Sequence, residues 1–131
     1  MKERSVLCVD DNFDNNELLE FFFEQAGYQV TICSTGEECL DCLKDHEFSA
    51  VVLDYHLPDK DGLALFKEIR KLYPQTPVII FSADARNSSR EAAIEAGVNA
   101  YLIKPDDIKN IVSVVTKLIE ARDLYKNVTN S

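Results

Sequence analysis

Polar side chains that could act together follow four apolar runs of this sequence. They are Asp10 and Asp11, Asp54, Ser82 and Lys104. Neighbouring carboxylates repel one another unless a cation joins them. Because the acidic groups offer oxygen ligands and no cluster of histidine or cysteine accompanies them, the chemistry favours a hard cation such as Mg²⁺. A magnesium ion, a lysine and a hydroxyl around a carboxylate can stabilise a phosphoryl group, and the carboxylate itself can be the nucleophile that accepts it.

Five short β-branched runs predict the strands that position these groups. They are SVLCV (5–9), YQVTIC (28–33), SAVVL (49–53), PVIIF (77–81) and NAYLI (99–103). Most are continuously apolar, which is typical of parallel strands that are covered on both faces. Because all strands of a parallel sheet point the same way, their carboxyl ends meet at one edge, where ligands bind.

Helical spacing between these runs predicts five helices. The first carries Leu18, Leu19, Phe22 and Ala26 on one stripe and ends at Gly27. The others are expected over 36–46, from an N-cap at Asp61 to before Pro74, from Ser88-Ser89 to Gly97, and along the apolar repeat from Ile108 to Ile119. Five strand–helix units predict an α/β fold in which a doubly wound, five-stranded parallel sheet carries helices on both faces.

Size and composition indicate one globular domain. The chain has 131 residues, of which 46% are hydrophobic and 28% charged. We expect the domain to cover 1–125, with a polar tail over 126–131. The 23 acidic and 14 basic residues give a net charge of −9, which disfavours direct binding to nucleic acid. No apolar run approaches the ~18 residues that cross a membrane and no signal peptide is recognisable, so we expect a cytoplasmic protein without membrane attachment.

Four cysteines, Cys8, Cys33, Cys39 and Cys42, raise the question of a zinc site. Cys39 and Cys42 form a C-x-x-C pair, but no second pair and no spaced histidine pair accompany it, so zinc is disfavoured. We expect free thiols that pack as small apolar residues, as in a reducing compartment.

Four motifs stand in a recognisable order along the chain. They are VLCVDD (6–11), VVLDYHLPDKDG (51–62), IIFSA (79–83) and YLIKP (101–105). In this order and spacing they resemble the receiver domain of two-component response regulators, over about residues 4–122. The resemblance implies a flavodoxin-like sheet with the strand order 2-1-3-4-5. It also implies a signalling protein, either a single-domain response regulator or a receiver from a larger regulator or hybrid kinase, whose phosphoryl donor is a histidine kinase or a histidine phosphotransfer protein.

The resemblance assigns the phosphoryl chemistry to individual residues. Asp54 accepts the phosphoryl group, Lys104 pairs with its oxygens and Ser82 hydrogen-bonds it. Ser82 and Tyr101 form a switch, in which Tyr101 turns inward when Ser82 moves. A cis peptide bond before Pro105 aims Lys104 at the site.

The resemblance also assigns a metal site and two residues that tune phosphoryl lifetime. Mg²⁺ is held by Asp11, Asp54 and the backbone carbonyl of His56, while Asp10 binds mainly through water. His56 and Asp84 flank the phosphoryl group and affect how long it survives hydrolysis. The sign of that effect stays open.

Phe21, Phe22 and Phe23 occupy consecutive helical positions, which cannot all face one core. We expect Phe21 or Phe23 to be partly exposed and to help dock the helix of a phosphodonor protein. The alternative is that these rings belong to a wide apolar stripe that packs against the core and have no docking role.

Two other classes of function are alternatives to a phosphoaccepting signalling protein. A phosphatase of the haloacid-dehalogenase type also uses an aspartate nucleophile and Mg²⁺, but it normally needs a second aspartate two residues on, where this chain has His56. A receiver that never takes phosphate usually lacks one of the acidic or lysine positions, and all are present here. The sequence therefore favours a phosphoacceptor that catalyses only its own phosphorylation and dephosphorylation.

Overall fold

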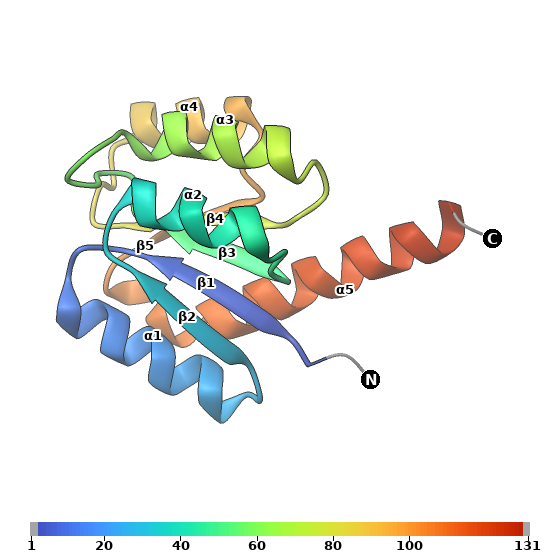
Figure 1. The fold of residues 1–131 in the computed structure, drawn as a ribbon. Helices are drawn as coiled ribbons and strands as arrows, with labels where there is room; N and C mark the ends of the chain where they lie inside the picture. Colours follow the sequence, from blue (N-terminus) through green and yellow to red (C-terminus); the bar gives the residue numbers. More distant parts are fainter. Residues whose placement is uncertain (1–2, 130–131) are drawn as a thin grey trace.

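A five-stranded parallel sheet organises the chain, of which the computed structural model describes residues 3–129 (Figure 1). The strands are β1 (Ser5–Val9), β2 (Gln29–Cys33), β3 (Ala50–Leu53), β4 (Val78–Ser82) and β5 (Ala100–Ile103). They lie in the order β2-β1-β3-β4-β5, and every neighbouring pair is parallel. Each strand end lies within one residue of its predicted position, so the predicted sheet and its order are confirmed.

Helices cover both faces of the sheet, as predicted. One face carries α1 (Phe13–Gln25) and α5 (Ile111–Thr129), and the other carries α2 (Gly36–Asp45), α3 (Gly62–Leu72) and α4 (Asn87–Ala96) (Figure 1). Helix α4 begins one residue before Ser88, and it ends at Gly97, which adopts the left-handed conformation (φ 109°) that favours glycine. None of the helices within residues 3–129 is both long enough and apolar enough to span a membrane.

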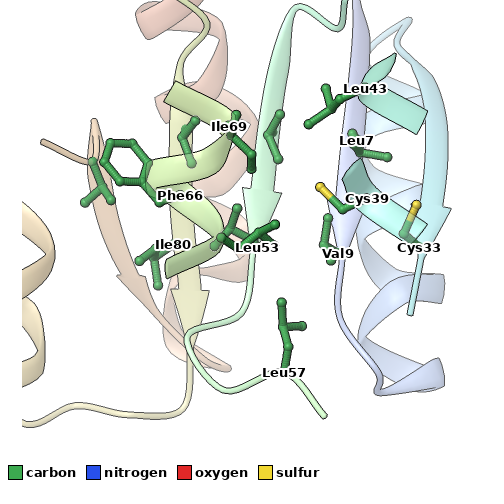
Figure 2. Close-up of a cluster of buried hydrophobic side chains, with 14 of the residues drawn as sticks. Leu7, Val9, Cys33, Cys39, Leu43, Leu53, Leu57, Phe66, Ile69 and Ile80 are labelled. Carbon is green, nitrogen blue, oxygen red and sulfur yellow. The ribbon is translucent and has the colours of Figure 1, made fainter. Parts of the chain in front are cut away.

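Alternate residues of the strands enter two separate apolar layers. In β1, Leu7 and Val9 belong to the layer under α2 and α3 (Figure 2). Val6 and Cys8 belong to the layer that contains residues of α1 and α5. Strands β3 and β4 are buried along their whole length. Burial on both faces explains why these strands read as continuous apolar runs.

The buried side of α1 differs from the predicted stripe. Asn16, Leu19 and Phe23 are buried, whereas Leu18 is 49% exposed and Ala26 is also exposed. The buried positions are spaced by three and four residues, so they share one side of the helix. The prediction was right for Leu19 and wrong for Leu18 and Ala26, because Leu18 points away from the side that packs on the sheet.

Helix α5 begins later and runs further than the apolar repeat predicted. Ile108 belongs to a separate 3₁₀ turn, η1 (Asp106–Lys109), whereas Ile111 and Ile119 are buried along α5. The helix continues to Thr129, into the segment 126–131 that the sequence predicts as a tail; residues 130 and 131 lie outside the described part of the chain. In Figure 1 its C-terminal end projects past the edge at which the strands begin.

Candidate functional site

Three aspartates gather at the edge of the sheet where the strands end. Asp10 and Asp11 follow β1, and Asp54 follows its hydrogen-bonded neighbour β3. One carboxylate oxygen from each lies within 4.8 Å of the others. The ends of adjacent strands come this close because paired strands lie about 4.8 Å apart. The strand order thus brings the three predicted metal-binding side chains together.

Asp10 is the buried member of this acidic cluster, with 2% of its surface exposed. Its Oδ1 accepts a hydrogen bond from the backbone N–H of Asn12 (2.9 Å), and its Oδ2 accepts one from Nδ2 of Asn15 (2.8 Å). Nδ2 of Asn16 donates to the Asp10 carbonyl (2.8 Å). Burial raises the pKa of Asp10, and a hydrogen bond from Lys104 opposes the rise. Sequence reasoning missed these asparagines, although the run NFDNN directly after the two aspartates contains all three.

Lys104 brings a positive charge to the cluster. Its Nζ forms ion pairs with Oδ2 of Asp10 and with Oδ2 of Asp54, the second at 3.2 Å. The side chain of Lys104 is only 16% exposed and that of Asp54 only 13%, so these charges interact more strongly than they would in water. The peptide bond between Lys104 and Pro105 is cis, as predicted.

The loop after β3 holds Asp54 close to the start of α3. The backbone N–H of His56 donates to Oδ1 of Asp54 (3.4 Å), and the N–H of Gly62 donates to the Tyr55 carbonyl (2.7 Å). A Cβ atom at Gly62 would lie 2.5 Å from the carbonyl oxygen of Asp54 and 2.8 Å from that of Tyr55. Only glycine therefore lets α3 begin this close to the backbone of Asp54.

Of two aspartates in the same loop, only Asp59 caps a helix with its side chain. Asp61 occupies the predicted N-cap position of α3, but its side chain makes no capping hydrogen bond. The Asp59 carboxylate instead accepts hydrogen bonds from the backbone N–H groups of Gly36 (2.9 Å) and Glu37 (3.0 Å) at the start of α2. These bonds, the one from Gly36 foremost, lower the pKa of Asp59. The loop that carries Asp54 is thereby fastened to the first turn of α2.

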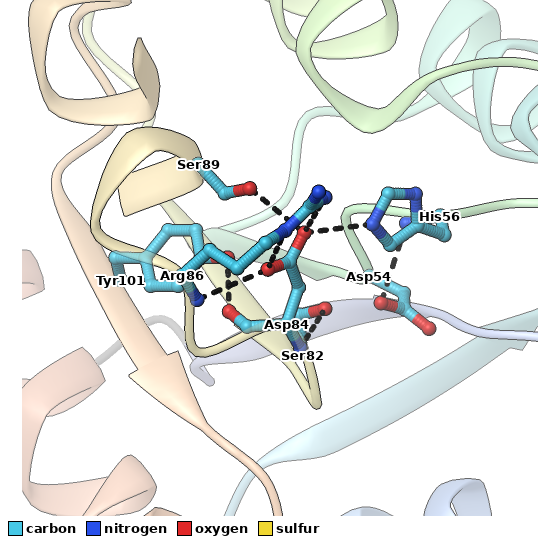
Figure 3. A network of polar contacts seen from close by, with 7 residues as sticks. All are labelled: Asp54, His56, Ser82, Asp84, Arg86, Ser89 and Tyr101. Atoms are coloured by element: carbon cyan, nitrogen blue, oxygen red, sulfur yellow. Dashed lines mark hydrogen bonds and ion pairs between the residues drawn. The ribbon is translucent and has the colours of Figure 1, made fainter. Parts of the chain in front are cut away.

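The two side chains that the resemblance assigns to a switch both contact the backbone of Asp84 (Figure 3). Oγ of Ser82, at the end of β4, accepts a hydrogen bond from the Asp84 N–H (3.2 Å). The hydroxyl of Tyr101, on β5, donates to the Asp84 carbonyl (2.6 Å). The ring of Tyr101 is buried, and this burial raises its pKa to about 12. The N–H of Lys104 also donates to the Ser82 carbonyl (2.9 Å), which links the ends of β4 and β5.

The carboxylate of Asp84 is the centre of a second polar network (Figure 3). Arg86 contacts both oxygens, Nε to Oδ1 at 3.0 Å and Nη2 to Oδ2 at 2.8 Å. Nε2 of His56 lies 2.9 Å from Oδ2, and the hydroxyl of Ser89 donates to the same oxygen at 2.8 Å. The hydrogen bonds from Arg86, His56 and Ser89 hold the pKa of Asp84 far below its ordinary value. Sequence reasoning named His56 and Asp84 but missed Arg86, whose position two residues after Asp84 was the available signal.

The donor set at the sheet edge suits a hard divalent cation. Asp11 is exposed and Asp54 partly exposed, so their oxygens are open to an ion that keeps several waters. One lysine compensates only part of the charge of three carboxylates. Within residues 3–129 no other group of three or more acidic, histidine or cysteine side chains is arranged to hold a metal ion. The arrangement can bind a cation and present Asp54, beside Lys104, to a phosphoryl group.

A doubly wound sheet in this strand order, with an acidic cluster and a lysine at its carboxyl edge, defines a flavodoxin-like α/β protein of the receiver class. Comparison with known families agrees, because residues 6–116 match the response regulator receiver domain. The chain belongs to this family, and the resemblance carried by the four motifs is confirmed.

Individual relatives support the same assignment. The chain is 31% identical over 114 residues to the transcriptional regulatory protein ZraR of Escherichia coli K12; the match covers 87% of this chain but 26% of ZraR. It is 34% identical over 118 residues to an uncharacterized 14.6 kDa protein from the sodA1 3′ region of Leptolyngbya boryana, with 88% and 89% of the two chains covered. Among solved structures, the Francisella response regulator 1452 receiver domain matches with a TM-score of 0.84 at 30% identity, over 90% of this chain and 98% of that one.

A methyl group at Gly62 is expected to disturb the Asp54 loop. Gly62→Ala should lower the free energy of unfolding by about 1–3 kcal/mol, because the added Cβ meets backbone atoms that cannot move aside. Gly36→Ala is the matched control: Gly36 also begins a helix, but its Cβ would meet the flexible side chain of Lys60, 2.6 Å from Cγ. Urea unfolding of both variants measures the difference, and equal losses of stability would contradict this account of Gly62.

Proposed function

We propose that this receiver domain is a Mg²⁺-dependent phosphoacceptor in which Asp54 takes a phosphoryl group from a phosphohistidine donor. The observation that carries the proposal is the position of the Asp54 carboxylate. Its Oδ2 lies 3.2 Å from Nζ of Lys104, and one of its oxygens lies within 4.8 Å of a carboxylate oxygen of Asp10 and of Asp11. A carboxylate in this position is a nucleophile surrounded by groups that stabilise the charge of the transferred phosphoryl group. The product is an aspartyl phosphate at the end of β3.

Asp11 and Asp54 are the direct metal ligands in this proposal, together with the backbone carbonyl of His56. Asp10 acts through water, because its two carboxylate oxygens already accept hydrogen bonds from a backbone N–H and from Asn15. When bound, Mg²⁺ neutralises negative charge on the phosphoryl oxygens and helps to orient them. Binding of the ion also relieves the repulsion among the three carboxylates.

Ser82 and Tyr101 form the switch in this proposal. Phosphorylation adds negative charge and oxygen acceptors beside Lys104. When the Ser82 hydroxyl turns to the phosphoryl group, it leaves the Asp84 N–H that it contacts at 3.2 Å. Tyr101 already lies inward in this structure, 4% exposed and bonded to the carbonyl of the same residue, so the inward turn that the resemblance implies does not start from this conformation. Movement of Asp84 acts instead on this bond. The charge change at Asp54 is thus passed to the surface beside β5 through the backbone of one residue.

The chain is a receiver of the signalling type, and we infer that its chemistry is confined to its own phosphorylation and dephosphorylation. A phosphatase of the haloacid-dehalogenase type needs an acid at position 56, where the His56 ring instead pairs with Asp84. We place the protein in the cytoplasm, where a phosphohistidine donor acts, and the four free cysteines suit that reducing compartment.

Incubation with acetyl phosphate and Mg²⁺ should add a single phosphoryl group, measured by intact mass. Asp54→Asn should abolish the addition, because the amide lacks the nucleophilic carboxylate, and EDTA should abolish it in the unmodified chain. Asp61→Asn is the matched control, because Asp61 lies in the same loop and makes no capping hydrogen bond. Unchanged labelling of the Asp54 variant would reject the acceptor assignment, and continuous turnover of a phosphate ester would favour a phosphatase.

The proposed partner, a histidine kinase or a histidine phosphotransfer protein, docks on α1. This helix begins two residues after Asp11 and exposes Phe13 (72%), Leu18 (49%) and Phe21 (55%). Phe23 is fully buried, so of the two rings that the sequence named as candidates only Phe21 can contact a partner. In this proposal these exposed apolar side chains contact the partner, and the start of α1 beside Asp11 brings a docked helix close to the acceptor.

Phe21→Ala is expected to slow phosphotransfer from a phosphorylated histidine phosphotransfer domain by about tenfold, the effect of losing one well-placed aromatic contact. Labelling by acetyl phosphate should be unchanged, because the small donor needs no docking surface. Leu72→Ala is the control, since Leu72 is 50% exposed but lies on α3, across the sheet from α1. Rapid-quench measurement of both reactions tests the idea, and equal slowing with both donors would count against docking.

We infer that the hydrogen-bonded pair of His56 and Asp84 sets how long the phosphoryl group survives. The pair joins the loops after β3 and β4 at 2.9 Å, and these loops flank Asp54 (Figure 3). The His56 side chain is 59% exposed, whereas that of Asp84 is 6% exposed and is held by Arg86. Because the pair joins two loops that flank Asp54, in this proposal a closed pair hinders the approach of a hydrolytic water and slows its attack.

His56→Ala should shorten the lifetime of the phosphorylated chain several-fold. Asp84→Ala should have the same effect, and the double variant should decay no faster than either single one, because each change opens the same pair. His46→Ala removes the other histidine of the chain and serves as the control. Decay followed by intact mass after removal of the phosphodonor measures the lifetime; a longer lifetime in His56→Ala, or additive effects, would overturn this role.

A further inference from the structure

Two cysteine thiols from different elements lie in contact beside α2. The Sγ atoms of Cys33 and Cys42 are 3.5 Å apart and share a hydrogen bond. Cys33 is the last residue of β2, and Cys42 lies in the second half of α2. Cys33 is buried, with 3% of its surface exposed, whereas Cys42 is only partly buried. Cys42 is therefore the partly exposed residue of the pair, and Cys33 is the buried one.

This contact joins Cys42 to a cysteine outside the C-x-x-C motif. Cys39 and Cys42 both belong to α2, but Cys39 is fully buried in the apolar layer that Figure 2 shows, and burial raises its pKa to about 12. Within the described residues, the thiols do not form a group of three ligands placed to hold a metal ion. The contact between Cys33 and Cys42 therefore points to chemistry between two sulfur atoms rather than to metal binding.

We propose that Cys33 and Cys42 are a redox-modification site that closes to an intramolecular disulfide when the chain meets a small organic disulfide. The thiolate of Cys42 attacks one sulfur of the oxidant, and the other sulfur leaves as a thiol, which produces a mixed disulfide on Cys42. The sulfur of Cys33 then attacks the Cys42 sulfur and displaces the second thiol of the oxidant. Each cysteine gives up one proton, so the chain loses two hydrogen atoms and the oxidant is reduced to two thiols.

Burial decides the order of these two steps. Burial raises the pKa of Cys33, and its hydrogen bond with Cys42 adds to the rise, so Cys33 does not compete for an oxidant in solution. Once Cys42 carries the mixed disulfide, Cys33 is held next to the sulfur that it must attack, which raises its effective concentration. The two sulfur atoms start 3.5 Å apart, so side-chain rotation has to bring them to a bonding distance of about 2.0 Å.

The site lies outside the proposed phosphorylation chemistry. The bond would fasten β2 to α2. Both elements also contact the acidic site: the Cys33 carbonyl accepts the backbone N–H of Asp10 at 3.0 Å, and Asp59 of the Asp54 loop accepts the N–H of Gly36 at the start of α2. No side chain proposed to bind Mg²⁺ or the phosphoryl group takes part in thiol exchange. The test therefore needs no phosphodonor, and its outcome is independent of whether Asp54 is phosphorylated.

The experiment treats the reduced full chain with oxidised glutathione, quenches it in acid, and alkylates the remaining thiols after unfolding. We expect intact mass to show the loss of two hydrogen atoms and alkylation of two of the four cysteines, with a Cys33–Cys42 cross-link in the peptide map. Cys42→Ser should prevent both the cross-link and the mixed disulfide. Cys33→Ser should stop at a glutathione adduct on Cys42, and Cys39→Ala, an apolar change on the same helix, should react like the unmodified chain.

Several results would overturn the proposal. They are a Cys39–Cys42 cross-link, a disulfide between two chains, a lasting glutathione adduct in the unmodified protein, or four alkylated thiols after oxidation. Cys33→Ser introduces a hydroxyl at a buried position, so thermal unfolding followed by circular dichroism accompanies each variant. Cys42→Ser changes a partly exposed position. If the Cys33 variant does not fold, the loss of both the cross-link and the mixed disulfide in Cys42→Ser tests the proposal.

Discussion

The site depends on charge compensation between Lys104 and the carboxylates of Asp10 and Asp54. Three carboxylates have oxygens within 4.8 Å of one another, and one of them, Asp10, is almost fully buried. Burial alone would favour the neutral form of Asp10, and the hydrogen bond from Lys104 opposes that effect. A buried negative charge is tolerated only when a positive partner and hydrogen-bond donors reach it. The end of β5 must therefore lie close enough to the ends of β1 and β3 for one lysine to contact two of them.

The loops around this charge cluster are anchored to the rest of the fold at few, well-defined points. Gly62 allows the Asp54 backbone to lie against the start of α3, and Asp59 ties the same loop to the start of α2. Asp84 connects the loop after β4 to its surroundings by its N–H, its carbonyl and its carboxylate. The loops around Asp54 are therefore held by hydrogen bonds, which can exchange partners, rather than by deep apolar packing. Such loops can rearrange when the charge at Asp54 changes.

Much of the fold could be predicted from the sequence, because a parallel strand buried on both faces is apolar at nearly every position. Strands β1, β3 and β4 were recognisable for this reason, whereas β2, at the edge of the sheet, has exposed positions. The polar residues after four of the five runs marked the edge where a site forms. Prediction was weaker for α1, where adjacent apolar residues such as Leu18 and Leu19 leave the buried side ambiguous. Packing against the sheet selects Leu19 and Phe23 and leaves Leu18 and Phe21 exposed.

The sequence by itself determined which residues could do chemistry, since their types and their positions after strands are local properties. It determined the motifs around Asp54 and Lys104 and, through them, the family. Only the tertiary structure decided the pairs that join separate segments: Asp59 with the start of α2, His56 with Asp84, and Cys33 with Cys42 instead of Cys39 with Cys42. Such pairs depend on the distance and direction between elements, which packing sets and which no local pattern along the chain records.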